Sequence, residues 1–158
     1  MEESHGGLSP EERWRLKFAM SLFVLDTDIL VLFQEGHEEV CRRLLSHPIE
    51  ELAISVITVE EQLSGWYTLL RRTKDSEKLA RAYQRLADAV TLLSQFRILS
   101  FTEPAIERFQ QLKSQKLGIK HMDLRIAAIA LEHAGTLATR NIRDFQCVPG
   151  LAVENWSV

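Results

Sequence analysis

A short apolar run that ends in acids constrains the fold of this chain more than any other stretch. Leu22–Leu25 are four consecutive apolar residues, and Asp26-Thr27-Asp28 follows directly. Four apolar residues in a row suit a strand that is buried on both faces, and the polar residues after it suit the start of a helix. Ligands of open parallel sheets bind at the carboxyl ends of the strands, so other acids at the same edge would form a site.

Apolar segments typical of strands alternate with amphipathic segments along the rest of the chain. After the first strand, we expect strands over 52–57, 97–101, 136–139 and 151–153, and helices over 38–45, 58–72, 75–93, 105–115 and 122–131. Strands that alternate with helices predict an α/β domain with a mostly parallel sheet of about five strands. We therefore expect one three-layer α/β/α domain over residues 22–158, with helices on both faces of the sheet.

Three local patterns add detail to this expectation. The helix over 75–93 has an apolar stripe at helical spacing, which predicts a core-facing side. Gly135 is the expected C-terminal stop of the apolar helix over 122–131, and residues 140–145 suit a polar loop or a single helical turn. The stripe consists of Leu79, Ala82, Tyr83, Leu86, Ala89, Val90 and Leu93.

Residues 1–21 precede the first strand and form an N-terminal extension to which we assign no function. Ser9-Pro10-Glu11-Glu12 is a helix-start signal, because Ser9 suits the cap and Pro10 suits the first helical position. Trp14, Leu16 and Phe18 suit either a short amphipathic helix or a frayed end.

Composition excludes several classes of protein. The chain has 158 residues, of which 46% are apolar and 26% charged, as expected for one domain with a real core. A net charge of −3 argues against binding nucleic acid by bulk attraction, although a nucleic-acid enzyme with a local basic patch fits. No apolar run approaches the ~20 residues of a membrane span. Cys41 and Cys147 have no CxxC partner, which predicts free thiols in the cytoplasm.

Each conspicuous acid has an ordinary local interpretation. Asp26 suits a helix cap, and Thr58-x-x-Glu61 is a capping-box pattern. Asp123 near a helix start complements the helix dipole, and Asp144 suits an Asx-turn. Taken one at a time, these acids indicate nothing beyond helix and turn chemistry.

Their shared position indicates more. Asp26, Glu61 and Asp144 each closely follow an expected strand, and the strand-to-helix turns of a parallel sheet lie along one edge. Buried carboxylates repel one another unless a cation neutralises them, and Mg²⁺ or Mn²⁺ prefers such oxygen ligands. Asp123 joins them only if its helix begins beside the same edge. The same positional rule nominates three further acids: Asp28, Glu60 and Glu103.

Four segments, in order, carry a family resemblance: Leu25–Leu30, Ile54–Glu61, Asp123–Ala130 and Thr139–Phe145. Together they resemble the PIN-domain ribonucleases, and most closely the VapC toxins of bacterial type II toxin–antitoxin systems. The resemblance extends from about residue 22 to residue 156 and implies a PIN-like fold. It assigns the second acid to Glu61 rather than Glu60, and it leaves Glu103 as a capping residue.

The resemblance implies a Mg²⁺-dependent endoribonuclease, with Mn²⁺ as the alternative ion. The catalytic acids would be Asp26, Glu61, Asp123 and Asp144. Asp26 and Asp123 would hold the metal directly, whereas Glu61 and Asp144 would bind it directly or through water, and the metal would activate a water molecule.

Three further residues would support this set. Thr139 and Asn141 would orient water or a carboxylate by hydrogen bonding. Asp28 stands where the family more often has Asn, so it is a candidate metal or water ligand, but helix capping is its expected role.

The resemblance also implies partners. The RNA backbone would meet basic residues near the motifs, the antitoxin would be a VapB-type protein whose tail occludes the acidic pocket, and the toxin would be a homodimer. Two alternatives stay open: a PIN nuclease of RNA maturation or DNA processing, and an inert PIN binding module, against which the complete set of acids speaks. The basic candidates are Arg140, Arg143, Lys120 and Arg125.

Overall fold

The structure is a computed structural model that describes residues 8–13 and 22–158. A five-stranded sheet with the order β3-β2-β1-β4-β5 forms its centre, and every neighbouring pair of strands is parallel. The mostly parallel sheet expected from the sequence is thus confirmed. The strands are β1 (Phe23–Leu25), β2 (Leu52–Ser55), β3 (Arg97–Leu99), β4 (Thr136–Ala138) and β5 (Ala152–Glu154).

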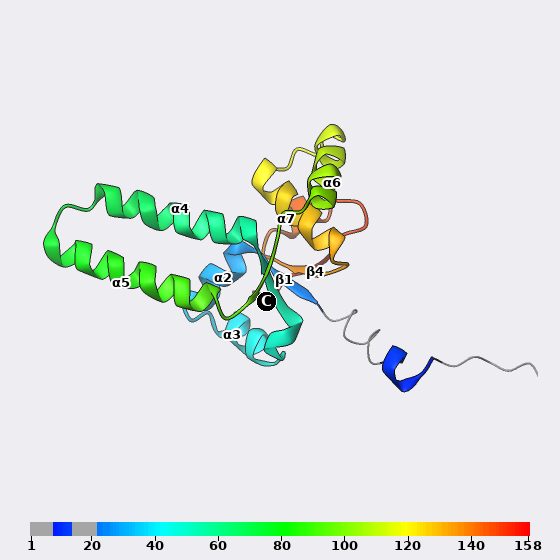
Figure 1. The fold of residues 1–158 in the computed structure, drawn as a ribbon, viewed down its shortest axis with the longest axis horizontal. Helices are drawn as coiled ribbons and strands as arrows, with labels where there is room; N and C mark the ends of the chain where they lie inside the picture. The colour runs from blue at the N-terminus through cyan, green and yellow to red at the C-terminus, as the bar shows by residue number, and fades with distance from the viewer. Residues whose placement is uncertain (1–7, 14–21) are drawn as a thin grey trace, which may run out of the picture.

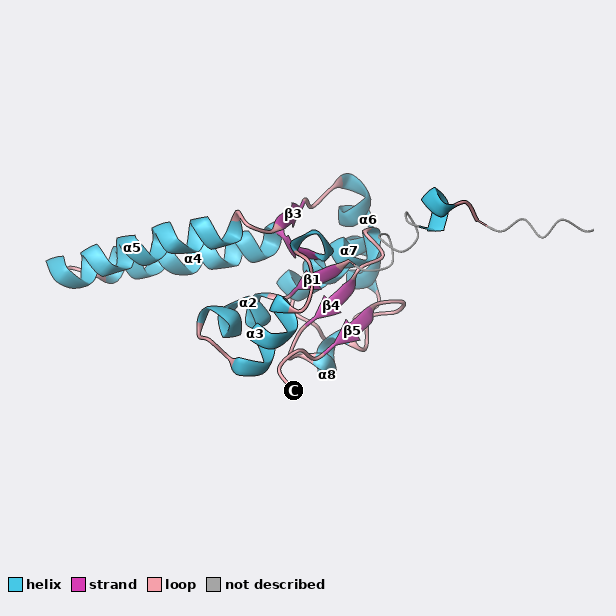
Figure 2. Cartoon of the chain, turned by 90° about the horizontal axis from the view of Figure 1, so that it is seen from below, coloured by secondary structure: helices cyan, strands magenta, loops and turns pink. Residues whose placement is uncertain are grey.

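Helices connect the strands and cover both faces of the sheet (Figure 1, Figure 2). No helix in the described part of the chain combines the length and apolarity needed to cross a membrane. The helices are α2 (Thr27–Gln34), α3 (Glu38–Leu45), the 3₁₀ turn η1 (Ile49–Glu51), α4 (Val56–Arg72), α5 (Ser76–Leu93), α6 (Glu103–Ser114), α7 (His121–Glu132) and the single turn α8 (Ile142–Phe145).

Alternation along the central strands builds the three layers. Val24 and Leu137 point into the core beneath α6 and α7, whereas their neighbours Leu25 and Ala138 point into the core beneath α2 and α3. All four side chains are fully buried. Strands buried on both faces explain the uninterrupted apolar runs in the sequence.

The boundary between β2 and α4 differs from the expectation. The strand ends at Ser55, whose hydroxyl accepts a hydrogen bond from Thr58 N–H (3.1 Å) and caps a helix that begins at Val56. The expected strand through Ile57 and the capping box at Thr58 are therefore wrong. Val56 and Ile57 are β-branched and apolar, so their residue types fit a strand as well as a buried first helical turn.

The helix α7 ends at Glu132, three residues before Gly135, which was expected to stop it. The positive φ angle after this helix belongs to Ala134 (49°). Gly135 is required instead by close packing, because a Cβ atom there would lie 3.0 Å from Cγ2 of Val24. The glycine lets the chain enter β4 directly beside β1.

The predicted core-facing stripe of α5 is only partly buried. Ala82, Ala89 and Leu93 are buried, but Tyr83 and Val90 are 56% and 49% exposed. The α4–α5 hairpin projects from the body of the protein, so its outer turns have few neighbours other than each other (Figure 1, Figure 2). Helical spacing predicted the apolar face of α5 correctly, but it could not show that no other element of the described structure covers the outer part of this face.

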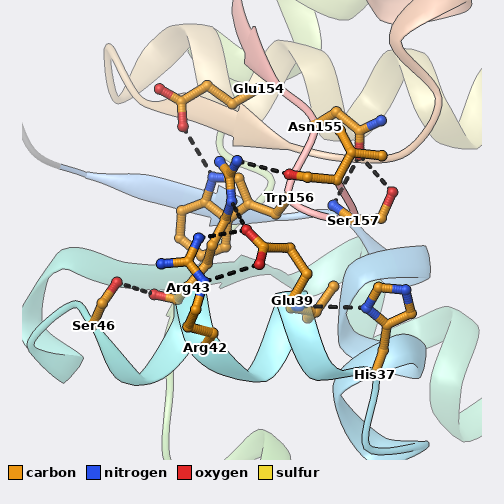
Figure 3. Close-up of polar contacts among 11 residues, drawn as sticks. His37, Glu39, Arg42, Arg43, Ser46, Glu154, Asn155, Trp156 and Ser157 are labelled. Atoms are coloured by element: carbon orange, nitrogen blue, oxygen red, sulfur yellow. Dashed lines mark hydrogen bonds and ion pairs between the residues drawn. The ribbon is translucent and has the colours of Figure 1, made fainter.

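The C-terminal segment packs against the α3 side of the sheet (Figure 3). The buried Trp156 donates through Nε1 to Glu154 Oε2 (2.9 Å), and its ring stacks on His47 with centroids 5.2 Å apart. Arg43 of α3 donates to the backbone oxygen of Val158 (2.8 Å). These contacts hold the strand β5 and the residues after it against the domain.

Within the extension, residues 10–13 are helical. The hydroxyl of Ser9 accepts from Glu12 N–H (3.1 Å), and Ser9 N–H donates to Glu12 Oε2 (2.7 Å), so the expected helix start is confirmed. The expectation for Trp14, Leu16 and Phe18 lies outside the described residues.

Candidate active site

Three neighbouring strands bring the candidate residues to one edge of the sheet. The strands β2, β1 and β4 end at Ser55, Leu25 and Ala138, and Asp26 and Thr139 follow the last two directly. Asp26 N–H donates to the carbonyl oxygen of Ala138 (2.9 Å), which extends the β1–β4 pairing by one step. The carboxyl edge of the sheet is therefore lined by polar residues at the strand ends, with Ser55 as the last residue of β2 and Asp26 and Thr139 directly after β1 and β4.

Asp26 is almost fully buried, and two hydrogen bonds hold its carboxylate in place. Its side chain is 6% exposed; Oδ1 accepts from Thr27 N–H (2.8 Å), and Oδ2 accepts from the hydroxyl of Thr139 (2.7 Å). It caps α2, as its position predicted. Burial and the nearby charge of Asp28 raise the pKa of Asp26 to about 7, against the lowering effect of the two hydrogen bonds.

Asp28 has a different role from the one expected. Asp26 occupies the cap of α2, so the helix-capping prediction for Asp28 is wrong. Its Oδ2 instead accepts from Arg140 N–H (3.0 Å) in the β4–α8 loop, with a longer contact from the Thr139 hydroxyl (3.5 Å). Its Oδ1 is buried and has no hydrogen-bond partner, and burial raises the pKa of this carboxyl. An orphaned carboxylate oxygen beside Asp26 is a feature that a cation would satisfy.

Glu61 reaches the same edge from the second turn of α4. The hydroxyl of Thr27 donates to Glu61 Oε1 (3.0 Å) and also lies 3.1 Å from the hydroxyl of Thr58. Burial, followed by the charges of Asp123 and Glu60, raises the pKa of Glu61. Thr27 and Thr58 were not singled out from the sequence, because only the pairing of β1 with β2 makes them neighbours.

Asp123 reaches the same edge from a helix that precedes a strand, whereas Asp26 and Glu61 follow strands. It lies in the first turn of α7, the helix that precedes β4, so its N-terminus lies at the carboxyl edge. Burial, with the charges of Asp144 and Asp28, raises the pKa of Asp123, whereas Lys120 lowers it. Asp144 itself accepts from the amide Nδ2 of Asn141 (2.9 Å).

A cleft of about 530 Å³ contains most of this set. Asp144 is not among its lining residues, although its charge acts on Asp123. Within residues 8–13 and 22–158, no three His, Cys, Asp or Glu side chains already form a cluster that would hold a metal ion. The polar residues that line the cleft are Asp26, Thr27, Asp28, Glu35, Glu61, Asp123, Arg140 and Asn141.

The four basic residues proposed to contact RNA do not lie in one place. Arg140 lines the cleft, and Lys120 and Arg143 are exposed at the starts of α7 and α8. Arg125 lies elsewhere: its guanidinium packs over the ring of Phe109 at 5.3 Å. Glu60 and Glu103 are exposed and do not line the cleft, as expected once the family motifs are considered.

The raised pKa of Asp26 predicts how stability depends on pH in the absence of divalent cations. A carboxyl whose folded pKa is about 7, against 3.8 as its ordinary value, stabilises the fold at low pH and loses that contribution as the pH rises through 7. Asp26→Asn resembles the protonated acid. We expect the variant to be more stable than the wild type at pH 8 by on the order of 4 kcal/mol, with the difference vanishing near pH 4.

Urea unfolding in EDTA between pH 4 and pH 8 measures this difference. The exposed Asp88 of α5 is the matched control, and Asp88→Asn should leave the pH dependence unchanged. A gap between wild type and Asp26→Asn that stays constant across this range would contradict the raised pKa.

Comparison with known proteins agrees with this geometry. The model of the PIN domain family matches residues 23–151. Toxin FitB of Neisseria gonorrhoeae is 32% identical over 130 residues, which are 78% of this chain and 91% of FitB. The tRNA(fMet)-specific endonuclease VapC of Salmonella typhimurium is 26% identical over 141 residues, which are 87% of this chain and 99% of that protein.

A solved structure is similar over the same region. One chain of a toxin–antitoxin complex from Klebsiella pneumoniae has a TM-score of 0.65 and 30% identity, over 84% of this chain and 96% of that chain. The family match begins with β1 and ends just before β5, and it includes every acid at the carboxyl edge. This chain is a member of the PIN-domain family.

Proposed function

We propose that this chain is a VapC-type endoribonuclease toxin, which hydrolyses RNA phosphodiester bonds with the help of a divalent cation and is neutralised by a VapB-type antitoxin. The observation that carries the proposal is the convergence of Asp26, Glu61 and Asp123 on one cleft of a PIN domain. Its relatives include an endonuclease and a toxin, which supports the same assignment.

Mg²⁺ is the proposed cofactor, with Mn²⁺ as the alternative. The donors around the cleft are oxygen atoms, as these ions prefer, and the buried Oδ1 of Asp28 has no partner in the protein. Burial and mutual repulsion raise the pKa of Asp26, Glu61 and Asp123, a cost that a cation would remove. Asp26 and Asp123 would hold the ion directly, and Glu61 and Asp144 directly or through water.

Hydrogen bonds within the protein orient the carboxylates of the site. A bound divalent cation supplies an acidified water molecule and offsets negative charge on the phosphate. Thr139 fixes Asp26, Thr27 fixes Glu61 and Asn141 fixes Asp144, each through a hydrogen bond of 3.0 Å or less. Glu61 is the proposed acceptor of the proton of the attacking water, because Thr27 holds its carboxylate at the cleft.

Substrate and partners follow from the same assignment. Arg140 lines the cleft, and Lys120 and Arg143 are exposed at the starts of α7 and α8, which supports these three residues as contacts for the RNA backbone. The similar Klebsiella complex supports an antitoxin partner, and the family resemblance supports a homodimer. Cys41 and Cys147 are free thiols, which supports a place in the cytoplasm.

We expect the purified chain to cleave total RNA in the presence of Mg²⁺ or Mn²⁺ and to lose this activity in EDTA. Asp26→Asn and Asp123→Asn should each reduce the rate at least 100-fold, because a carboxylate that holds the ion becomes a neutral amide. Calorimetric titration with Mn²⁺ should show binding that is lost in both variants.

Glu103→Gln is the matched control, since Glu103 is an exposed acid at the start of α6 and does not line the cleft. This control should cleave RNA and bind Mn²⁺ like the wild type. Equal cleavage by the wild type and both Asp variants, or cleavage that survives EDTA, would show that the assigned site is wrong.

Co-expression tests the toxin assignment separately from the chemistry. Expression of the chain should arrest bacterial growth, and co-expression of the reading frame adjacent and upstream should restore growth and yield a complex that copurifies. Asp26→Asn should be harmless in the same cells. Growth arrest that the neighbouring frame does not relieve would favour a nuclease of RNA maturation or DNA processing.

A further inference from the structure

The outer part of the α4–α5 hairpin concentrates positive charge in an otherwise acidic protein. Residues 66–85 contain six of the chain's 19 Lys and Arg but only two of its 22 Asp and Glu. We call the cations at the end of the hairpin the basic tip. The basic tip consists of Arg71, Arg72, Lys74, Lys78 and Arg81.

The basic tip is accessible and has little compensating charge. All five side chains are exposed, and the hairpin carries them away from the body of the domain (Figure 1, Figure 2). Within the described residues, Arg81 is the one cation of the basic tip that forms an ion pair, and its partner is Glu77 (3.3 Å). Asp75 caps α5 by accepting from Lys78 N–H (3.0 Å), so both acids of this region already have local roles.

A groove leads from the acidic cleft toward the basic tip. The groove has a volume of about 850 Å³ and lies between α2, α4 and α5. Val31, Glu35 and Glu61 line both the groove and the cleft, so the two spaces are continuous. A chain-like ligand that leaves the cleft through the groove would therefore run along the hairpin.

Helical periodicity places three of the five cations of the basic tip on the groove side of the hairpin. Arg85 of α5 lines the groove, and Arg81 and Lys78 lie four and seven residues before it on the same helical face. On α4, Leu69 lines the groove and Arg72 follows three residues later. Both walls of the groove thus continue outward into positive charge.

The spacing suits a nucleic acid rather than a single nucleotide. Glu61 and Arg72 are 11 residues apart on one helix, which at 1.5 Å per residue separates them by about 16 Å. The acidic cleft has one cation, Arg140, among its lining residues, so attraction for a polyanion must come largely from elsewhere.

We propose that the basic tip binds the phosphate backbone of the RNA substrate several nucleotides away from the bond cleaved in the acidic cleft. This inference rests on the proposed ribonuclease function, and it identifies a second contact that selects long or structured RNA over short fragments. Clustered exposed Arg and Lys match phosphates, whereas a protein partner would need a matching acidic segment.

Binding of a labelled 30-nucleotide RNA stem-loop to the full-length protein in EDTA tests the inference without cleavage. The test variant is Arg72→Gln/Lys78→Gln, which removes two cations that make no ion pair within the described residues. The dissociation constant at 0.1 M salt should rise about tenfold. The slope of log affinity against log salt should fall in magnitude by about 1.4 to 1.8, because each lost phosphate contact contributes 0.7 to 0.9.

Two control variants separate the position of the charges from their number and from folding. Arg97→Gln/Lys113→Gln also removes one exposed Arg and one exposed Lys, but from β3 and α6, and should change the dissociation constant less than twofold. Arg72→Lys/Lys78→Arg keeps both charges and should bind RNA like the wild type. With Mg²⁺ present, the test variant should raise KM for the long RNA and leave kcat unchanged.

The outcomes distinguish this inference from the proposed function. If the wild type cleaves RNA but Arg72→Gln/Lys78→Gln binds it with unchanged affinity and salt dependence, the basic tip is not an RNA contact and the nuclease assignment stands. If the test variant keeps RNA binding but no longer copurifies with the antitoxin, the surface belongs to a protein partner and the inference is overturned. A wild type that binds RNA with the predicted dependence on the tip, but never cleaves it, overturns the proposed function alone.

Discussion

The parallel pairing of β2, β1 and β4 is the constraint on which the candidate site depends. The pairing aligns three strand ends at one edge, and α7 returns to that edge because it runs into β4. The hydrogen bond from Thr139 to Asp26 Oδ2 (2.7 Å) then joins the ends of β1 and β4 directly. Carboxylates from distant parts of the sequence meet as a consequence of strand order, and their shared burial raises their pKa values.

The close approach of the acids at the carboxyl edge lowers the stability of the fold and at the same time forms the candidate cation site. Without a cation, the buried Asp26 lies beside the half-buried Asp28, and an ordinary fold would gain by replacing either with a neutral residue. Hydrogen bonds from Thr27, Thr139 and Arg140 N–H hold the acids in place despite this cost. The same acidity repels RNA, and we therefore propose that the attraction for substrate comes from cations near the cleft and along the α4–α5 hairpin.

The sequence predicts the layers of the fold and the first acid well because those features are local. Uninterrupted apolar runs indicate buried parallel strands, and Asp26 directly follows one of them. Residues that act across strands are less visible: Thr27 meets Glu61 only because β1 pairs with β2. Asp28 looked like a cap in the linear sequence, yet it reaches Arg140, which is distant along the chain. Gly135 likewise serves a packing contact with Val24 that no local pattern encodes.

Diffraction from crystals grown with Mn²⁺ tests the central claim most directly, because the anomalous signal locates the ion independently of any activity. If the carboxyl-edge acids form a cation site, an anomalous peak will lie in the acidic cleft, in contact with the carboxylates of Asp26 and Asp123. A cleft without such a peak, at a Mn²⁺ concentration that supports RNA cleavage, would contradict the claim. So would a Mn²⁺ ion bound only to residues outside the cleft.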